Sequence, residues 1–303
     1  MNGYDYIVVG AGSAGCVLAG RLTEDPACTV LLLEAGGDDS SALVRIPGAY
    51  TALQDTALDW GYRTSPQLHL NGRRIFSPRG KMLGGTSSLN YMMYVRGNPR
   101  DFDHWRELGN PGWGFAEVVP YFRRLENCHD PADEWQGRGG PVHITRDPQP
   151  HPLSALYLEA AQQAGLPCNP NFNGPEQLGC GVYQRTVFQG RRWSAADAYL
   201  RPAMERANLT VATRALALRL LFRSSAAVAG VEYLQRGEVR QAHAAREVIL
   251  CAGAFNSPKL LLLSGIGPAD ELRRLGVQPR IDLAGVGKNL RDHVTVRIGC
   301  EIT

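Results

Sequence analysis

The 303 residues are enough for two domains or one elaborate domain, and 44% apolar with 20% charged residues is ordinary for a soluble globular protein. The net charge of +3, with Lys and Arg scattered and not interleaved with aromatic residues, argues against a nucleic-acid partner. Four consecutive leucines, Leu260 to Leu263, are too few for a transmembrane segment.

The seven cysteines show no CxxC spacing. Their odd number and dispersal indicate reduced thiols in a cytoplasmic protein, with neither a disulfide framework nor a metal site. The N-terminus lacks the basic region of a signal peptide and contains Asp5, so its apolar run is expected to be a strand. Weak association with a membrane surface is left open.

The stretch from Tyr4 to Gly37 has the pattern of a strand, a tight turn, a helix and a second strand, which is the βαβ unit of a dinucleotide-binding sheet. Its parts are an apolar run, three glycines, an apolar-periodic segment and a second apolar run: Tyr6 to Val9; Gly10, Gly12 and Gly15; Cys16 to Leu22; Val30 to Leu33. The unit predicts that a pyrophosphate binds at the helix N-terminus, where N–H groups and the helix dipole favour an anion.

Each residue type in this unit has a physical role. Gly10 permits the turn, Gly12 allows close approach of a pyrophosphate, and Gly15 allows the helix to pack on the strand. Glu34 lies 19 residues after Gly15, at the end of the second strand, where its carboxylate can accept hydrogen bonds from both ribose hydroxyls. It would repel a 2′-phosphate, so FAD or NAD is favoured over NADP. The alternative is a Gly-rich turn in an ordinary α/β protein.

From Asp38 to Ser77 few regular elements are expected, and a segment of this length is uncommon unless it is functional. Trp60 within it could cover a ring system or could simply pack. Gly84 and Gly85 are followed by three hydroxyl residues, Thr86 to Ser88. Close backbone approach with several donors predicts a second phosphate or flavin contact, and the alternative is a Ser-rich loop that caps a helix.

The remaining pattern alternates helices and strands. Predicted helices are Asp101 to Leu108, Phe115 to Glu126 with a bend at Pro120, a segment from Leu153 to Ala164, Ser194 to about Ala207, Lys259 to Leu263 and Ala269 to Leu275. Predicted strands are Leu209 to Val211, a meander of Ala215 to Phe222, Val228 to Leu234 and Glu238 to Ala242, a buried central strand at Val248 to Cys251, and a strand from Val294 to Ile298. This order suits flavoproteins that bind two nucleotides better than an NAD dehydrogenase.

Four motifs together resemble the glucose–methanol–choline (GMC) oxidoreductase family in its N-terminal portion, closest to the choline-dehydrogenase-like and aliphatic alcohol dehydrogenases. They are GAGSAG, GKMLGGTSSLNYMMYVRG, GAFNSPKLLLLSGIG and GVGKNLRDH, which begin at Gly10, Gly80, Gly253 and Gly285. The resemblance implies an α/β, Rossmann-like FAD-binding domain with a β-meander and the beginning of an α+β substrate domain. The expected segments are 1–147 and 191–293 for the FAD-binding domain, 148–190 for a first excursion into the substrate domain, and 294–303 for the start of its sheet.

The resemblance also implies oxidation of an alcohol by hydride transfer to flavin N5, with oxygen or a quinone-type carrier as the electron acceptor. The residues expected to bind FAD are Gly10, Gly12, Ser13, Ala14, Gly15, Glu34, Ala35, Trp60, Gly84, Gly85, Thr86, Asn90, Tyr91, Met93 and Ala217. Some relatives attach FAD covalently through a histidine just before the motif asparagine. Leu89 occupies that position here, so non-covalent FAD is predicted.

The family's catalytic histidine, with its His or Asn partner, is expected C-terminal to residue 303. None of the seven histidines matches that motif, and His293 follows Asp292 in a polar turn. No catalytic residue is therefore assigned within this chain, which is expected to be an N-terminal fragment that is inactive alone. The alternatives are a non-catalytic FAD-binding fragment and a hydroxynitrile lyase-like protein with a structural flavin.

Overall fold

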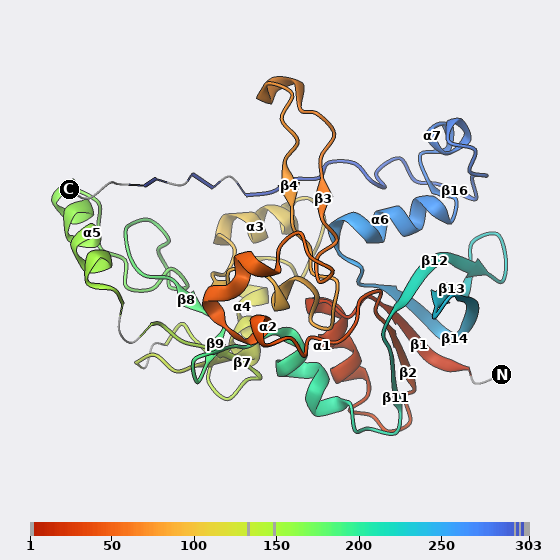
Figure 1. Cartoon of the computed structure of the whole chain (residues 1–303), viewed down its shortest axis with the longest axis horizontal. Helices are drawn as coiled ribbons and strands as arrows, with labels where there is room; N and C mark the ends of the chain where they lie inside the picture. The colour runs from red at the N-terminus through yellow and green to blue at the C-terminus, as the bar shows by residue number, and fades with distance from the viewer. Residues whose placement is uncertain (1–2, 132–133, 148–149, 294, 297, 300–303) are drawn as a thin grey trace.

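A six-stranded sheet organises the protein, whose computed structural model describes residues 3–131, 134–147, 150–293, 295–296 and 298–299 (Figure 1). The strands are β1 (Tyr4–Val9), β2 (Val30–Leu33), β11 (Leu209–Ala212), β12 (Ala215–Phe222), β13 (Val228–Gln235) and β14 (Glu238–Leu250). Their order in the sheet is β11-β2-β1-β14-β13-β12. The first four strands in that order run parallel, and β13 and β12 pair antiparallel. The predicted α/β class with a β-meander is confirmed.

Both faces of the parallel strands are buried, because successive side chains of a strand point to opposite faces. Val8 and Leu32 belong to a core beneath helix α1 (Ser13–Leu22). Val9 and Leu33 belong to a second core, which includes Leu260 of helix α6 (Gly253–Leu263) and residues of the meander. The near-continuous apolar runs of the sequence are thus strands covered on two sides.

Strand β14 corrects one prediction, since Glu238 to Ala242 and Val248 to Cys251 were expected to be separate strands. They form one strand of 13 residues. Its first part pairs antiparallel with β13 as far as His243, and its second part pairs parallel with β1 from Ala244 onward. Pairing with these two distant strands keeps the backbone extended through the polar residues in the middle of β14. Arg246 in this part forms an ion pair with Asp5 (3.3 Å).

Two helices differ from their predicted limits. Helix α6 begins at Gly253, directly after the sheet, and not at Lys259, so Pro258 lies inside it. A proline removes one backbone hydrogen bond, and the rest of the helix continues across it. The predicted helix from Ser194 to about Ala207 is shorter, with a π-helix η4 (Ala196–Leu200) and a 3-10 turn η5 (Arg201–Ala203).

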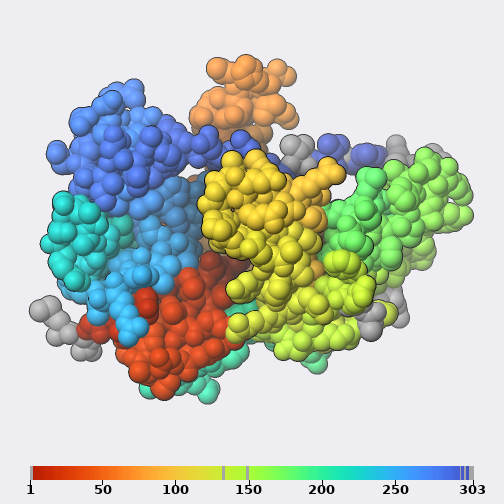
Figure 2. All heavy atoms as spheres, turned by 180° about the vertical axis from the view of Figure 1, so that it is seen from behind, coloured from red at the N-terminus to blue at the C-terminus, as the bar shows by residue number. Residues whose placement is uncertain are grey.

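Between β2 and residue 97 the chain forms only short elements: α2 (Ala42–Arg45), η1 (Pro47–Leu53), β3 (Tyr62–Arg63), η2 (Leu68–Leu70), β4 (Phe76–Ser77), η3 (Gly85–Ser88) and β5 (Met93–Tyr94). Strands β3 and β4 pair antiparallel at the base of an excursion that stands out from the body (orange in Figures 1 and 2). The predicted lack of long elements from Asp38 to Ser77 is confirmed.

The next part is mixed and lies beside the sheet: α3 (Pro99–Glu107), α4 (Phe115–Leu125), β6 (Glu126–Cys128), β7 (Val142–Ile144), α5 (Pro152–Gln163), β8 (Gln184–Arg185), β9 (Val187–Phe188) and β10 (Arg191–Arg192). Helix α3 begins where predicted, within two residues, and Asn98 caps it by accepting from Arg100 N–H (3.0 Å). Helix α4 contains Pro120, as expected.

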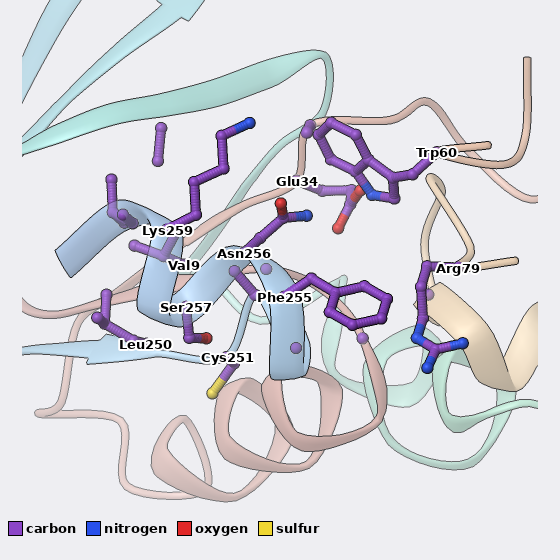
Figure 3. A pocket seen from close by; sticks show the side chains of 18 of the residues that line it. Val9, Glu34, Trp60, Arg79, Leu250, Cys251, Phe255, Asn256, Ser257 and Lys259 are labelled. Carbon is purple, nitrogen blue, oxygen red and sulfur yellow. The ribbon is translucent and has the colours of Figure 1, made fainter. Parts of the chain in front are cut away.

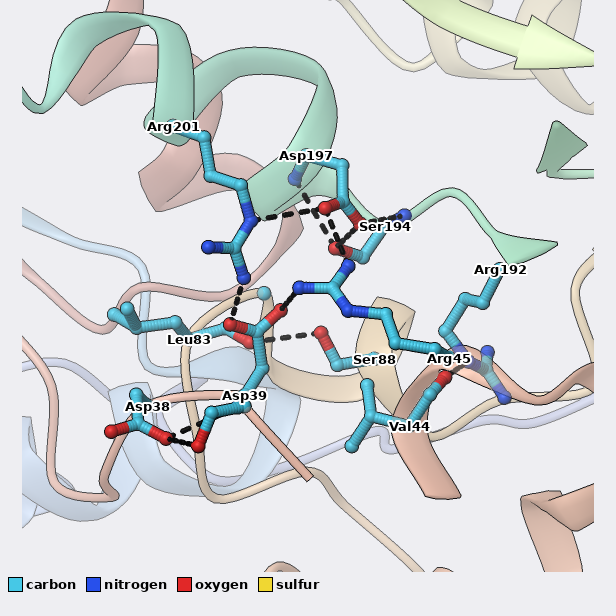
Figure 4. A network of polar contacts seen from close by, with 12 residues as sticks. Asp38, Asp39, Val44, Arg45, Leu83, Ser88, Arg192, Ser194, Asp197 and Arg201 are labelled. Atoms are coloured by element: carbon cyan, nitrogen blue, oxygen red, sulfur yellow. Dashed lines mark hydrogen bonds and ion pairs between the residues drawn. The ribbon is translucent and has the colours of Figure 1, made fainter. Parts of the chain in front are cut away.

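A closed set of ion pairs ties the α2 region to η4 and η5 (Figure 4). Arg45 bonds Asp197 (2.5 Å) and Asp39 (3.2 Å), and Arg201 bonds the same two aspartates. Ser194 donates its hydroxyl to Asp197 (2.7 Å) and accepts from the Asp197 N–H (3.3 Å). The predicted capping role of Ser194 is therefore confirmed, although the helix after it is irregular.

The chain after α6 forms β15 (Ile266–Gly267), α7 (Ala269–Arg274) and β16 (Ile281–Asp282). Helix α7 ends one residue before the predicted limit of Leu275. The strand predicted from Val294 to Ile298 includes positions that lie outside the described residues.

Candidate functional site

A cavity of about 580 Å³ opens at the carboxyl ends of β1, β2 and β14 (Figure 3). This is the edge at which open α/β sheets bind their ligands. The lining consists of Val9, Gly10, Gly12, Ser13, Ala14, Leu33, Glu34, Ala35, Trp60, Tyr62, Arg79, Gly80, Gly85, Thr86, residues 215–217 and 250–257, Lys259, Leu260 and Leu263. Four stretches of the chain, within 9–35, 60–86, 215–217 and 250–263, thus form one site.

Glu34 lies at the end of β2 with only 6% of its surface exposed. Its Oε2 accepts from Ala11 N–H (2.9 Å), and its Oε1 accepts from Gly36 N–H (2.8 Å). Burial raises the pKa of this carboxyl above its usual value, while the two N–H donors and the charge of Lys81 oppose that rise. The two bonds hold the carboxylate in a fixed orientation at the cavity and leave each oxygen capacity for a further donor.

The first glycine turn and the Gly84–Gly85 turn meet at the cavity. A Cβ on Gly85 would lie 2.7 Å from Gly12 Cα, so a side chain there would separate the two motifs. A Cβ on Gly12, in contrast, would have its nearest protein atom 3.9 Å away, at Cys251 O. The absent side chain of Gly12 therefore leaves space beside the first turn of α1, where backbone N–H groups have no partner within the helix. This arrangement fits a pyrophosphate.

Aromatic rings form one wall of the cavity. The rings of Trp60 and Tyr62 are stacked with centroids 5.7 Å apart, and Tyr62 meets Phe255 edge-on at 5.5 Å. The Tyr62 hydroxyl donates to Asn256 Oδ1 (2.6 Å), which links the β3 segment to α6. The Arg79 guanidinium lies 4.7 Å from the Phe255 ring centroid. The wall offers flat apolar surface with cationic groups at its border, which suits a planar ring system.

The structure brings ten of the fifteen predicted FAD-binding residues to the lining of this cavity and leaves the other five outside the lining. Those in the lining are Gly10, Gly12, Ser13, Ala14, Glu34, Ala35, Trp60, Gly85, Thr86 and Ala217. Gly15 lies behind the turn, where a Cβ would be 1.8 Å from Gly10 O, and Gly84 donates its N–H to Ala11 O (2.8 Å). Asn90, Tyr91 and Met93 follow η3 and are not among the lining residues.

Asn90 is held by a buried arginine. Its Oδ1 accepts from Arg192 Nη1 (3.0 Å) and from Met92 N–H (3.0 Å). Arg192 is 1% exposed and also donates to Val44 O (2.9 Å) and Ser87 O (3.1 Å). Burial lowers the pKa of Arg192 to about 10, against the opposing charge of Asp197. Tyr91 and Met93, by contrast, are exposed, and the Tyr91 ring lies against that of Tyr50.

Sequence reasoning missed several lining residues: Tyr62, Arg79, Phe255, Asn256 and Lys259. Tyr62 lies two residues after Trp60, Arg79 directly precedes the motif that begins at Gly80, and the other three belong to the motif that begins at Gly253. The available signal for the last three is their position directly after the returning strand β14, at the same sheet edge as Glu34.

The cavity can bind and orient a nucleotide, but its described lining contains no histidine that could act as a proton acceptor. Within the described residues, no group of three or more His, Cys, Asp and Glu side chains is arranged to hold a metal ion. The same part of the chain contains no helix that is both long and apolar enough to cross a bilayer.

Comparisons with known proteins agree on one family. A family model described as GMC oxidoreductase matches residues 4–295. The chain is 46% identical over 291 residues to the oxygen-dependent choline dehydrogenase of Sinorhizobium fredii, covering 96% of this chain and 53% of that protein. It is 48% identical over 303 residues to the mitochondrial choline dehydrogenase of Homo sapiens, covering 97% and 51%. The chain thus spans about half the length of these relatives.

Solved structures give the same result. Pyridoxine 4-oxidase from Mesorbium loti superposes with a TM-score of 0.89 at 38% identity, covering 93% of this chain and 55% of that chain. A formate oxidase superposes with a TM-score of 0.89 at 33% identity, covering 97% and 53%. The R554K variant of formate oxidase from Aspergillus oryzae RIB40 superposes with a TM-score of 0.88 at 34% identity, covering 97% of this chain and 53% of that chain. That structure was described for the effect of the mutation on FAD modification. The family and the cavity together support FAD as the cofactor.

Proposed function

Because the chain belongs to the GMC oxidoreductase family, we propose that it supplies the FAD site of an enzyme that oxidises an alcohol. A bound flavin would supply the hydride acceptor, at N5, for oxidation of the alcohol carbon. The likeness to choline dehydrogenases supports choline or a related alcohol as the substrate. The likeness to the oxygen-dependent enzyme supports oxygen as the electron acceptor. The observation that carries the proposal is the cavity at the sheet edge with the Glu34 carboxylate at one end and the Gly12–Gly85 contact beside it.

We infer the roles of individual residues from their positions. Glu34 accepts from the ribose hydroxyls, and the first turn of α1 at Ser13 and Ala14 receives the pyrophosphate. Ala217 lies by the adenine. Thr86, whose Oγ1 accepts from Gly80 N–H (3.2 Å), begins a second line of contacts toward the flavin ring. Asn90, Tyr91 and Met93 continue that line, with Asn90 oriented by Arg192. The segments 1–147 and 191–293 are proposed as the FAD-binding domain.

We propose that FAD is bound without a covalent link. Leu89 has no nucleophilic atom, is 2% exposed and packs in a small core with Met82, Leu53 and Val44. Acid precipitation of the yellow protein should therefore release all flavin into the supernatant. Flavin that stays with the precipitated polypeptide would contradict this proposal.

The FAD site is tested by Gly12→Ala, with Gly48→Ala as the matched control. A methyl group at either position meets no close protein atom, so both variants should fold like the parent. At position 12 the methyl occupies the space proposed for the pyrophosphate, and we expect FAD affinity to fall at least ~10-fold, or about 1.4 kcal/mol. Gly48 lies outside the cavity lining, and its variant should bind like the parent. Equal FAD affinity in all three proteins would contradict the proposed site.

Hydride transfer from an alcohol also requires a proton acceptor near the reacting carbon. Because the described lining of the cavity contains no histidine, we propose that the catalytic base lies outside this chain. The test adds choline, and separately medium-chain alcohols, to the FAD-loaded chain with an artificial electron acceptor. We expect no turnover above that of free FAD. Clear turnover would show that a base within these residues suffices.

A further inference from the structure

Two cysteines face each other across a loop outside the cavity, residues 167–181. Cys168 and Cys180 are partners in an isolated parallel β-bridge. Asn169 N–H donates to Cys180 O (2.8 Å), and Cys180 N–H donates to Pro167 O (2.8 Å). In such pairing the two backbones lie about 4.8 Å apart, and the partner side chains point to the same face.

The arms of this loop are held close by small residues and by one buried amide. Glycines flank Cys180, and a Cβ at Gly181 would lie 2.1 Å from Asn169 O. The Asn169 side chain is 6% exposed and donates to Glu176 O (2.9 Å) and Leu178 O (3.2 Å). The positions opposite each other are therefore fixed by the fold of the loop.

Exposure distinguishes Cys168 from the other described cysteines. Cys168 is exposed, Cys180 and Cys251 are partly exposed, and Cys16, Cys28 and Cys128 are buried. Burial raises the pKa of Cys16 to about 12 and also raises the pKa of Cys128 and Cys251. Since the thiolate is the form that reacts with oxidants, those three are poor nucleophiles. A soluble oxidant therefore has best access to Cys168.

We propose that Cys168 and Cys180 are a redox-modification site that forms an intrachain disulfide on reaction with hydrogen peroxide. One thiolate attacks the peroxide, the O–O bond breaks, and a sulfenic acid and hydroxide form; the hydroxide takes up the proton that the thiol had released, which gives water. The second thiolate then displaces hydroxide from that sulfur, the S–S bond forms, and the hydroxide takes up a proton. In total two thiols are oxidised by two electrons, and the peroxide is reduced to two waters.

The geometry suits this bond. A disulfide needs Cα atoms about 4.4–6.8 Å apart and Cβ atoms about 3.5–4.5 Å apart. The parallel bridge sets the two backbones about 4.8 Å apart, within the Cα range of a disulfide, and directs both side chains to the same face. The disulfide would also affect residues 94–96. Asn173, which lies within the 167–181 loop, accepts from Arg96 N–H (2.6 Å) and donates to Tyr94 O (3.2 Å). Closing the loop restrains Asn173 and, through it, these two residues.

The experiment treats the 303-residue chain with hydrogen peroxide, alkylates free thiols under denaturing conditions, and digests without reduction using a protease that cuts after Glu. Because Glu176 lies between the two cysteines, we expect two peptides that remain joined, with a mass two hydrogens below their sum. Reduction should separate them. Two of the seven thiols should escape alkylation.

Variants identify the pair. Cys168→Ser and Cys180→Ser should each abolish the joined peptides and leave the remaining cysteine to gain oxygen. Cys251→Ser, which removes a partly exposed cysteine elsewhere, should retain them. Oxygen adducts in the parent without joined peptides would overturn the proposal. So would joined peptides that occur only in a covalent dimer on a non-reducing gel.

Discussion

Val8 and Leu32, in the parallel part of the sheet, are fully buried among aliphatic side chains. In the region beside the sheet, residues 92–97, 126–131 and 134–137, a set of buried polar side chains holds the chain together. Arg96 and Glu126, with side chains 1% and 0% exposed, form a two-bond ion pair at 2.8 and 2.6 Å. Glu126 also accepts from Tyr94 (2.6 Å) and from Gly137 N–H (2.8 Å).

The difference shows how two regions of one chain can be equally buried and yet depend on different forces. Apolar burial is roughly proportional to area and tolerates small shifts of the neighbours. A buried ion pair is stabilising only while every partner is present, because an unpaired buried charge is costly. The segment that leads from η3 into β5 and Arg96 therefore depends on a few exact partners, whereas the nucleotide edge depends on general packing of strands and helices.

The largest effect is expected for Glu126→Gln. The amide lacks the charge and one acceptor, so Arg96 is left as an uncompensated buried cation, and we expect a loss of about 3–5 kcal/mol in the free energy of unfolding. Urea denaturation measures it. Glu24→Gln, in the exposed Arg21–Glu24 pair, should change stability by less than ~1 kcal/mol. Similar losses for both variants would remove the contrast between buried and exposed pairs.

Leu32→Ala tests the sheet side of the comparison. Leu32 is 0% exposed in the core between β2 and α1, and its truncation should cost about 3 kcal/mol through lost burial and a residual cavity. Leu275→Ala, at a position 75% exposed, is the control and should stay within ~0.5 kcal/mol of the parent. A loss in Leu32→Ala no larger than in the control would mean that the sheet core is not tightly packed.

Arg192→Met compares the hydrogen bonds of a buried guanidinium with the cost of its desolvation. The variant leaves Val44 O, Ser87 O and Asn90 Oδ1 without this donor, for an expected loss of about 2 kcal/mol. The exposed neighbour in Arg191→Met should cost less than ~0.5 kcal/mol. A gain in stability would show instead that desolvation of the buried guanidinium outweighs its three bonds.

The smallest effect concerns pH and Asp197. Burial would raise the pKa of this carboxyl, but the Ser194 bonds and Arg45 outweigh that and leave it lowered. A carboxyl with a lowered folded pKa stabilises the protein above its unfolded pKa of about 3.9, and the contribution is lost as pH falls through the folded value. Melting temperatures between pH 6 and 3 should fall less steeply in Asp197→Asn than in the parent. Asp25→Asn, in an exposed turn, controls for the loss of one negative charge.

Local patterns alone determined the opening βαβ unit, the helices α3, α4 and α5, and the meander, because each is encoded by its own periodicity, caps and turns. They also predicted Glu34, Gly12 and Gly85 as site residues, and the structure places all three in the lining of the cavity. Local sequence patterns could not predict that two expected strands join into β14, because the continuous strand depends on its pairing with β13 and β1.

Only the tertiary structure showed which distant residues meet. Tyr62 and Asn256 lie 194 positions apart and share a hydrogen bond at the cavity, and Arg192 reaches Asn90 across 102 positions. Cys168 and Cys180, which the sequence presents only as two dispersed cysteines, are opposed by backbone bonds. Contacts of this kind depend on how the loops pack over the sheet, and the local propensities of the residues do not encode that packing. The sequence predicted a nucleotide edge, and the fold determined the walls of the cavity around it.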